Sequence, residues 1–331
     1  MRSAATCKAT HDRRRPSGCR APPEGDRHQR AEITPQPATV ATTRMTLTPV
    51  APACDDVSEG DTNMTHGWTP RLVLDPVLRD EASFANQDYA PHADDLSINP
   101  DMFRRYHTPS ELWDWRQLAA LLLGDVAGKD LLDMACGMGE ESVYFAQLGA
   151  RVTGIDISDV GVASLRKRAA HHRLDITALE MRVDPTSFAD SSFDRIHGLG
   201  ILHHVGIERG LAEVDRLLRP GGLGVFLEPI GDSPTVEAVK TFLMKHARFL
   251  GEFDRVTEHE HNLTWREVEA AVQRFTDVRL YPFHLLYRLK RLFPESWLDE
   301  IKRIDQGLLA LAPRLRHYAG GVVIAVRSKK R

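Results

Sequence analysis

Apolar and polar positions alternate along residues 130–327 with two different periods, and together they predict strands that alternate with helices. Short β-branched runs are typical of buried strands, whereas apolar residues three or four positions apart indicate helices that pack by one face. The predicted strands are 130–135, 152–156, 178–183, 194–199, 222–227, 278–283 and 322–326. The predicted helices are 140–148, 159–172, 208–218, 234–249 and 265–274. This order of elements predicts an α/β domain with helices on both faces of a mostly parallel sheet.

The pattern differs in two segments before this core and in one segment within it. Residues 1–66 are rich in Arg, Ala, Thr and Pro without periodic apolar positions, so we expect a disordered tail. Residues 67–127 are expected to form a helical cap, with one helix from its N-cap Ser110 to about Leu123. The core comprises residues 128–331.

Within the core, residues 284–320 carry leucines and isoleucines at helical spacing, interleaved with seven Lys and Arg residues. We expect this insertion to be helical, and to pack over the edge of the sheet or line a substrate pocket. Its basic and apolar composition leaves a role at a membrane surface or with an acidic partner open.

A segment near the start of the core predicts a cofactor site. The strand 130–135 contains Asp133 and leads into a turn with Gly137 and Gly139; a helix follows, and the next strand ends at Asp156. Glycine lets the backbone approach a ligand closely because it has no Cβ. An acid at the end of the second strand, about 20 residues past the glycines, can accept hydrogen bonds from both hydroxyls of a ribose. Nucleotide-containing cofactors bind on such a frame.

Two residues distinguish between cofactor classes. A dinucleotide fingerprint has glycine or alanine at its third position, where this chain has Ser142. A pyrophosphate gains nothing from the carboxylate of Asp133, whereas a cofactor with a free α-amino group and no phosphate does. The segment resembles motif I and the following acidic motif of the class I S-adenosylmethionine-dependent methyltransferases.

Three later segments extend this resemblance in the family's order, over roughly residues 100–327. They are Arg182-Val183-Asp184-Pro185, the "SFD…LHH" pattern of 192–204, and the Pro-Gly-Gly turn within 213–222. The resemblance implies a Rossmann-like sheet of seven strands, mostly parallel, with the last strand antiparallel. It also implies that S-adenosylmethionine is the cofactor, bound by Asp133, Ala135, Gly137, Gly139, Asp156, Ile157, Asp184, Pro185 and Leu199.

The resemblance gives these residues separate roles. Asp133 is expected to meet the methionine end, although it could instead cap the next helix, and the backbone carbonyl of Leu199 is expected to face the methionine amine. Asp156 is expected to bind the ribose. Ile157 should pack on the face of the adenine, with Asp184 near the adenine amino group.

Candidates for catalysis follow the fourth and fifth strands. His203 and His204 lie at the carboxyl end of a strand, where open α/β sheets place ligands, and either could be a general base. The same pattern recurs in the family whatever the substrate, so His203 could belong to the cofactor wall instead. Glu228 ends the fifth strand and could orient an acceptor hydroxyl or amine, or stabilise the fold by hydrogen bonding.

Three further residues are candidate substrate contacts. Tyr106 matches a position at which many small-molecule methyltransferases cover the cofactor. His259 and His261 would point the same way from an extended segment. Since they have no clear third ligand, we expect no metal site.

Composition narrows the range of partners. Residues 1–44 carry nine Lys or Arg against four Asp or Glu, so the net charge of −3 for all 331 residues leaves an acidic remainder. An acidic body is a poor partner for a phosphate backbone, and we expect no nucleic-acid partner. The four cysteines lack metal or disulfide spacing, which fits a cytoplasmic location. No apolar run approaches the roughly 18 residues that span a bilayer.

These observations predict an S-adenosylmethionine-dependent methyltransferase that acts on a small-molecule acceptor, with O-methylation slightly favoured over N- or C-methylation. A macromolecular (RNA or protein) methyltransferase would need a basic or peptide-binding surface, which the tail alone offers. An NAD-dependent oxidoreductase would use the same frame, but Ser142 and Asp133 count against it. A non-catalytic cofactor-binding module stays open, as do the acceptor's identity and the oligomeric state.

Overall fold

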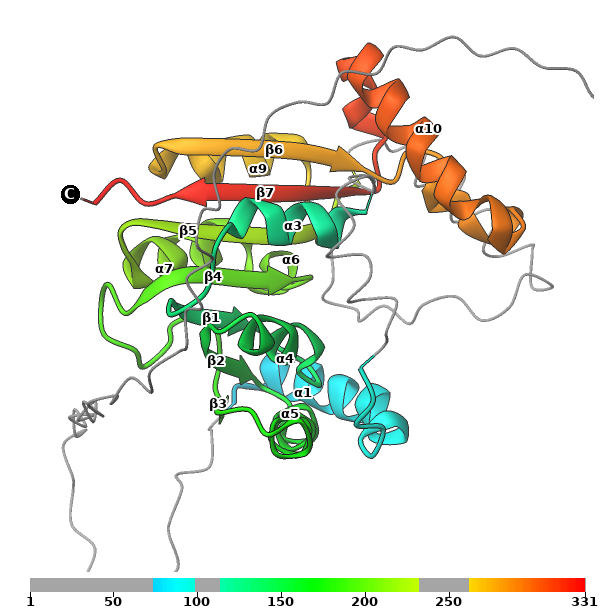
Figure 1. Ribbon diagram of the computed structural model, residues 1–331. Coiled ribbons are helices and arrows are strands. Elements are labelled where there is room, and N and C mark those ends of the chain that lie inside the picture. Colours follow the sequence, from blue (N-terminus) through cyan, green and yellow to red (C-terminus); the bar gives the residue numbers. More distant parts are fainter. Residues whose placement is uncertain (1–73, 99–113, 232–261, 331) are drawn as a thin grey trace, which may run out of the picture. The chain divides into compact units, whose positions relative to one another are not determined.

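The computed structural model describes residues 74–98, 114–231 and 262–330, all of which belong to one compact unit that begins at Trp68 (Figure 1). The expected tail 1–66 and the expected helix 234–249 lie outside the described residues.

A seven-stranded sheet forms the centre of this unit, in the order β3-β2-β1-β4-β5-β7-β6. Its strands are β1 (Asp130–Met134), β2 (Arg151–Asp156), β3 (Ile176–Glu180), β4 (Phe193–Leu199), β5 (Leu218–Pro229), β6 (Asp277–Phe283) and β7 (Gly321–Arg327). The neighbours among β1 to β5 pair in parallel, whereas β7 runs antiparallel to both β5 and β6. The predicted Rossmann-like sheet is therefore confirmed, including its antiparallel last strand.

Successive residues of the central strands enter two different hydrophobic layers. On β1, Leu131 packs in one layer and Leu132 in the other, and both are fully buried. This follows from the two-residue period of a strand, which points neighbouring side chains to opposite faces. Because both faces are covered, β7 has a continuous apolar run over residues 322–326.

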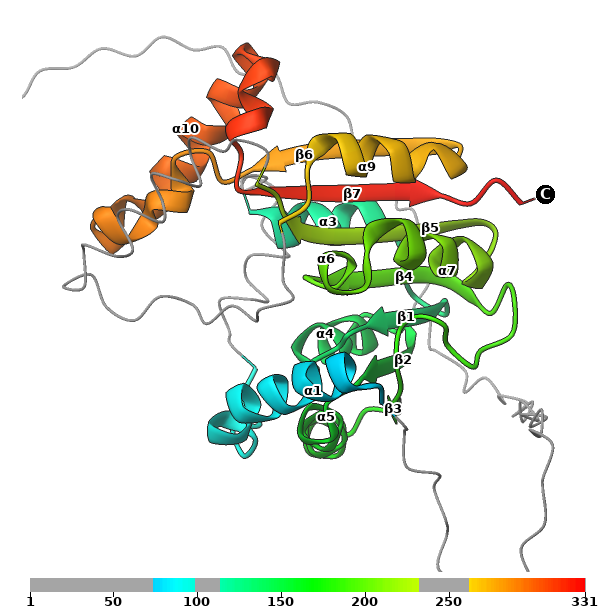
Figure 2. The same ribbon diagram turned by 180° about the vertical axis from the view of Figure 1, so that it is seen from behind.

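Helices cover these two faces (Figure 2). Helices α7 (Ile207–Leu217) and α9 (Trp265–Ala271) pack in the layer that contains Leu132, and α9 begins with a capping box formed by Thr264 and Glu267. Helices α3 (Trp115–Leu123) and α4 (Glu140–Gln147) pack in the layer that contains Leu131. Helix α5 (Asp159–His172) packs beside β2, β3 and α4.

The expected cap 67–127 divides into two elements with different roles. Helix α3 begins at Trp115 with Asp114 as its N-cap, and its C-cap is Gly124, which has a φ of +68°. The predicted N-cap Ser110 lies outside the described residues. The helix buries Ala119 and Leu123 against the sheet, so it is a layer of the core. The second element is α1 (Pro76–Tyr89), which is followed by a 3-10 turn at Ala90–His92 and has the role of the cap.

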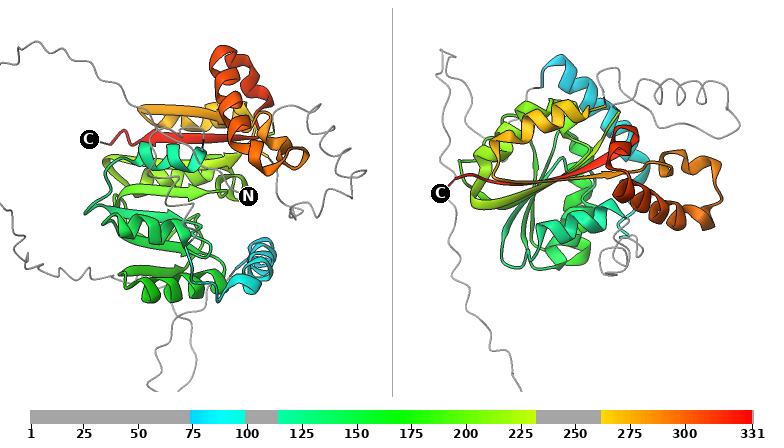
Figure 3. Two further views of the ribbon diagram at one scale, coloured as in Figure 1. Left: turned by 45° about the vertical axis from the view of Figure 1, so that its right-hand side comes forward. Right: turned by 90° about the horizontal axis from the view of Figure 1, so that it is seen from above.

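The insertion before the last strand is helical, as predicted. Helix α10 (Leu298–Leu311) lies between 3-10 turns at Tyr287–Leu292, Glu295–Trp297 and Pro313–Tyr318. The Nζ of Lys302 on α10 lies 3.2 Å from the carboxylate of Asp114, and both side chains are buried. Helices α10 and α1 extend past the carboxyl ends of the parallel strands, near opposite edges of the sheet (Figures 1 and 3).

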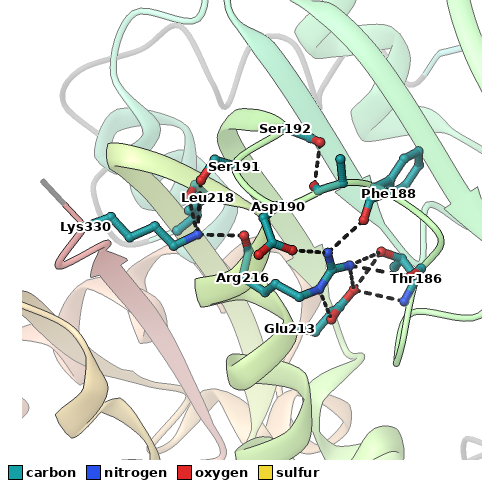
Figure 4. A network of polar contacts seen from close by, with 10 residues as sticks. Thr186, Phe188, Asp190, Ser191, Ser192, Glu213, Arg216, Leu218 and Lys330 are labelled. Atoms are coloured by element: carbon teal, nitrogen blue, oxygen red, sulfur yellow. Dashed lines mark hydrogen bonds and ion pairs between the residues drawn. The ribbon is translucent and has the colours of Figure 1, made fainter. Parts of the chain in front are cut away.

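The connection between β3 and β4 is tied to α7 by one guanidinium group (Figure 4). Arg216 donates to Glu213 at 2.6 Å, to Asp190 at 2.7 Å and to the carbonyl of Phe188 at 2.7 Å. Glu213 also accepts from the backbone N–H of Thr186 at 2.9 Å. This network holds the loop that begins at Asp184.

Candidate functional site

A pocket of about 680 Å³ lies at the carboxyl ends of β1, β2 and β4, with α1 as its opposite wall. The sheet side contributes Ala135, Asp156, Ile157, Asp184, Leu199 and His204. Helix α1 contributes Leu78, Glu81, Phe84, Ala85, Asp88 and Tyr89. Those six positions recur at the spacing of one helical face. The pocket therefore lies where an open α/β sheet is expected to bind a ligand.

Asp156 brings a buried carboxylate to this pocket. Its side-chain oxygens accept hydrogen bonds from the backbone N–H groups of Gly137 and Ser158, each at 2.8 Å. Burial raises the pKa of Asp156 above its ordinary value, although these backbone donors act in the opposite direction. Further donors from a ligand would stabilise the charged carboxylate, as the hydroxyls of a ribose do.

The small residues of the glycine loop have different structural roles. Gly139 has a φ of +86°, and a Cβ there would lie 2.3 Å from a methyl group of Leu165 on α5. Gly137 has a φ of +51°, and a Cβ there would lie 3.2 Å from the hydroxyl of Tyr89. Ala135 lines the pocket and itself has a φ of +59°, which side-chain-bearing residues rarely adopt. Gly139 thus serves the packing of α4 on α5, whereas Gly137 faces α1.

Asp133 lies behind this loop and is not among the residues that line the pocket. Its carboxylate is buried and accepts from the Ser142 hydroxyl at 2.5 Å and from Nδ1 of His197 at 2.9 Å. These contacts join β1, β4 and α4, and the expected contact of Asp133 with the methionine end stays a prediction. The contact also gives a reason for Ser142, which is a small donor at a fully buried position.

Asp184 lines the pocket as expected, whereas the adjacent Pro185 is exposed and does not. The Asp184 carboxylate lies 2.7 Å from the guanidinium Nε of Arg209 on α7. Nε of Arg182 donates to the backbone carbonyl of Asp184 at 2.6 Å. These contacts orient the residue that was expected beside the adenine.

The two adjacent histidines have different surroundings. They lie in the short helix α6 (Leu202–Val205), and their ring centroids are 4.2 Å apart. His203 is buried, with Nδ1 2.8 Å from the carboxylate of Glu228. His204 lines the pocket, with Nδ1 3.2 Å from the carboxylate of Glu81 on α1. The structure thus brings one of the two predicted bases, His204, to the pocket.

Glu228 is fully buried and does not line the pocket, so it does not have the position of an acceptor contact. Besides His203, it accepts from the backbone N–H groups of Ile201 at 3.0 Å and Leu202 at 2.9 Å. It therefore has the fold-stabilising position that the sequence left as the alternative, and it holds the start of α6.

Other predicted contacts are not placed. Tyr106, His259 and His261 lie outside the described residues. In the part of the chain that the structure describes, no three His, Cys, Asp or Glu side chains are grouped to hold a metal ion. The described residues of the insertion 284–320 are not among those that line this pocket. No described helix combines the length and the apolar character that crossing a bilayer needs.

The pocket face of α1 was missed by the sequence analysis. Two signals in the sequence indicate this helix: Asp75 and Pro76 form an N-cap and first turn, and apolar residues follow at helical spacing. The sequence analysis assigned no role to Glu81, and its position in the pocket lining and its contact with His204 identify it as part of the site.

Comparisons with known proteins agree with this geometry. A family model described as "Methyltransferase domain" matches residues 131–222. A ubiquinone biosynthesis O-methyltransferase of Nitrosococcus oceani is 31% identical over 175 residues, which are 50% of this chain and 72% of that protein. A demethylmenaquinone methyltransferase of Tropheryma whipplei is 36% identical over 115 residues, 34% of this chain. That second match covers 47% of its protein, so the chain spans about half the length of such relatives.

Among solved structures, a geranyl diphosphate C-methyltransferase from Streptomyces coelicolor, in complex with Mg²⁺, geranyl diphosphate and S-adenosyl-L-homocysteine, shares the fold. It superposes with a TM-score of 0.50 at 16% identity, covering 76% of this chain and 98% of the other. At this identity the similarity concerns the fold alone.

Proposed function

Because this chain belongs to the class I S-adenosylmethionine-dependent methyltransferases, we propose that it transfers a methyl group to a hydroxyl group of a small-molecule acceptor. The observation that carries this proposal is the shared pocket, which joins the ribose-binding candidate Asp156 to the proton-accepting candidate His204.

S-adenosylmethionine, the cofactor of this family, fits the residues on the sheet side of the pocket. The buried Asp156 offers acceptor oxygens, and Ile157 and Val183 offer apolar surface for an adenine ring. Asp184 offers a carboxylate beside that surface. When bound, the cofactor supplies a methyl group on a positively charged sulfur, which keeps the bonding electrons when the methyl leaves.

The α1 side of the pocket favours an acceptor that is mostly apolar. Val77, Leu78 and Phe84 from α1 and Ile201 and Val205 near His204 supply apolar side chains. Burying such surface contributes roughly 25 cal/mol per Å² to binding. An acceptor with an apolar body and one ionisable hydroxyl matches this lining.

The residues of the chain then have two tasks. The pocket walls hold the acceptor oxygen close to the methyl group and in line with it. This positioning can lower the activation free energy by several kcal/mol. His204 takes the proton that the hydroxyl loses, and a positioned base typically accelerates such a step by about 10²- to 10⁴-fold. The name of the Nitrosococcus oceani relative, an O-methyltransferase, supports the choice of oxygen.

The cofactor assignment is tested by Asp156→Asn. An amide cannot accept from two backbone N–H groups and also from ribose hydroxyls, and hydrogen bonds to a charged group contribute about 1.5–3 kcal/mol each. We expect the affinity for S-adenosylmethionine, measured by isothermal titration calorimetry, to fall by roughly 10- to 100-fold. Asp175→Asn, an exposed acid before β3, is the control and should bind like the wild type. Equal affinities in both variants would contradict the assignment.

The acceptor is sought by incubating the protein with methyl-labelled S-adenosylmethionine and a panel of apolar phenols, enols and amines. Mass spectrometry should find the label on an oxygen of one acceptor, with release of S-adenosylhomocysteine. Label on carbon or nitrogen would correct the reaction type. Cofactor binding without any methylated product would indicate a non-catalytic binding module. The expectations of a cytoplasmic location and of no nucleic-acid partner stay predictions.

A further inference from the structure

We propose that Glu81 positions His204 for proton acceptance, so that the cap helix supplies one half of a glutamate–histidine pair in the pocket. This inference rests on the proposed function. Its starting point is the distance of 3.2 Å between Oε2 of Glu81 and Nδ1 of His204.

Two glutamate–histidine pairs lie side by side at this site, and burial distinguishes them. In the pair of Glu228 and His203, the side chains are 0% and 7% exposed. In the pair of Glu81 and His204, they are 12% and 25% exposed, and both residues line the pocket. The inner pair therefore supports the backbone of α6, whereas the outer pair can meet an acceptor.

The contact with Glu81 decides which ring nitrogen of His204 can take a proton. A carboxylate next to Nδ1 favours the neutral tautomer that carries its proton on Nδ1, which leaves the Nε2 lone pair as the acceptor. When the acceptor O–H bond breaks, its proton moves to Nε2 and its electron pair stays on the oxygen that forms the new bond to the methyl carbon. Glu81 then stabilises the imidazolium, as a buried acid does in other proton-transfer sites.

Helix α1 is anchored so that Glu81 is held in place. Oδ1 of Asn86 accepts from the Ser158 hydroxyl at 2.5 Å, and its Nδ2 donates to Asp159 at 2.8 Å. These contacts join α1 to the N-terminal end of α5, next to the ribose-binding candidate Asp156. Helix α1, anchored in this way, therefore covers the cofactor side of the pocket and places Glu81 beside His204 on the acceptor side.

Glu81→Met tests the role, because methionine is similar in length and favours helix but offers no carboxylate. In the full-length protein with S-adenosylhomocysteine bound, nitrogen-15 NMR of the histidine rings should show His204 as the Nδ1–H tautomer in the wild type. The Nε2–H tautomer should gain population in the variant. Unchanged tautomer populations in Glu81→Met would overturn the proposal.

Kinetics provide the second readout, with the acceptor that the labelled-cofactor screen identifies. Glu81→Met should lower kcat by roughly 10²-fold, with the KM for S-adenosylmethionine within twofold of the wild type. Glu81→Asp should recover part of kcat, and Glu81→Gln covers the case in which methionine disturbs folding. Asp80→Asn is the matched control, since this acid is the exposed neighbour on α1. A kcat within threefold of the wild type in both Glu81→Met and Glu81→Gln would overturn the inference.

The two proposals fail in different ways. A wild-type protein that binds S-adenosylmethionine but methylates no acceptor would refute the proposed function, while a tautomer change in Glu81→Met would still support the positioning of His204. A methylating wild type whose His204 tautomer and kcat do not respond to Glu81 would refute the positioning alone.

Discussion

Buried carboxylates around the glycine loop make the stability of the protein depend on pH. Burial raises the pKa of Glu141 on α4, although the guanidinium of Arg116, 3.3 Å away, opposes this shift. A carboxyl group whose pKa is higher in the folded state than in the unfolded state stabilises the fold most at low pH. That contribution is lost as pH rises through the folded-state pKa. The ionised form of Glu141 is therefore unfavourable for folding near neutral pH.

Glu141→Gln removes this pH-dependent cost. We expect the melting temperature of the variant, relative to that of the wild type, to increase as pH rises above the ordinary range of a glutamate carboxyl, and to level off above the folded-state pKa. Scanning calorimetry at a series of pH values measures the difference. Glu140→Gln, the partly exposed neighbour in the same helical turn, is the control. A difference between Glu141→Gln and wild type that does not change with pH would contradict the assignment of the shift to burial.

At the scale of elements, one loop and one helix depend on Arg216 of α7. Burial alone would raise the pKa of Glu213, but the hydrogen bonds from Arg216 and Thr186 outweigh burial and lower it. The C-terminal segment joins the same helix end, because Nζ of Lys330 donates to the carbonyl of Arg216 at 2.6 Å (Figure 4). The network thus links the end of α7 to the loop that carries the pocket residue Asp184.

Arg216→Met breaks this network and leaves the carboxylate of Glu213 without its main partner. We expect a loss of about 2–4 kcal/mol in the free energy of unfolding at pH 7, measured by urea denaturation. Because these hydrogen bonds lower the folded-state pKa of Glu213, its stabilising contribution is lost as pH falls through that pKa. The difference in unfolding free energy between the variant and the wild type should therefore shrink near pH 4. Arg314→Met, at an exposed position of the insertion, should change stability by less than about 0.5 kcal/mol. Similar losses in both variants would argue against the network.

At the scale of the whole molecule, the described elements form a core to which two helical additions are attached. Helix α1 is joined to α5 through Asn86, and α10 is joined to α3 through the buried pair of Lys302 and Asp114. The residues from Trp68 onward form a compact unit by themselves. We therefore expect the fold and the pocket described above to form without residues 1–67.

Deletion of residues 1–67 should leave this unit intact. We expect the melting temperature to stay within about 2 °C of the full-length protein, which corresponds to a change of less than roughly 1 kcal/mol. The affinity for S-adenosylmethionine should stay within twofold, as measured by calorimetry. A large fall in either quantity would show that the N-terminal segment contributes to the folded unit.

The sheet, the chain order of its strands and helices, and the position of Asp156 at the end of a strand could be predicted from the sequence alone. These features depend on local signals: the alternation of Leu131 and Leu132 between two apolar layers, the glycines that permit a positive φ, and Asp156 at the end of a strand. The resemblance to the methyltransferase family then indicated which cofactor binds, namely S-adenosylmethionine. Such signals lie within a few residues of one another, so they can be recognised before the chain folds.

Which side chains meet became known from the three-dimensional fold. Asp133 and His197 are 64 positions apart, yet neighbouring strands bring them together behind the glycine loop, away from the pocket wall. The adjacent residues His203 and His204 were equivalent in sequence, but a helix directs neighbouring side chains about 100° apart. One therefore meets Glu228 inside the core and the other meets Glu81 of a distant helix. The periodicity of a segment shows which of its faces is buried, but it does not identify the remote segment that packs against that face.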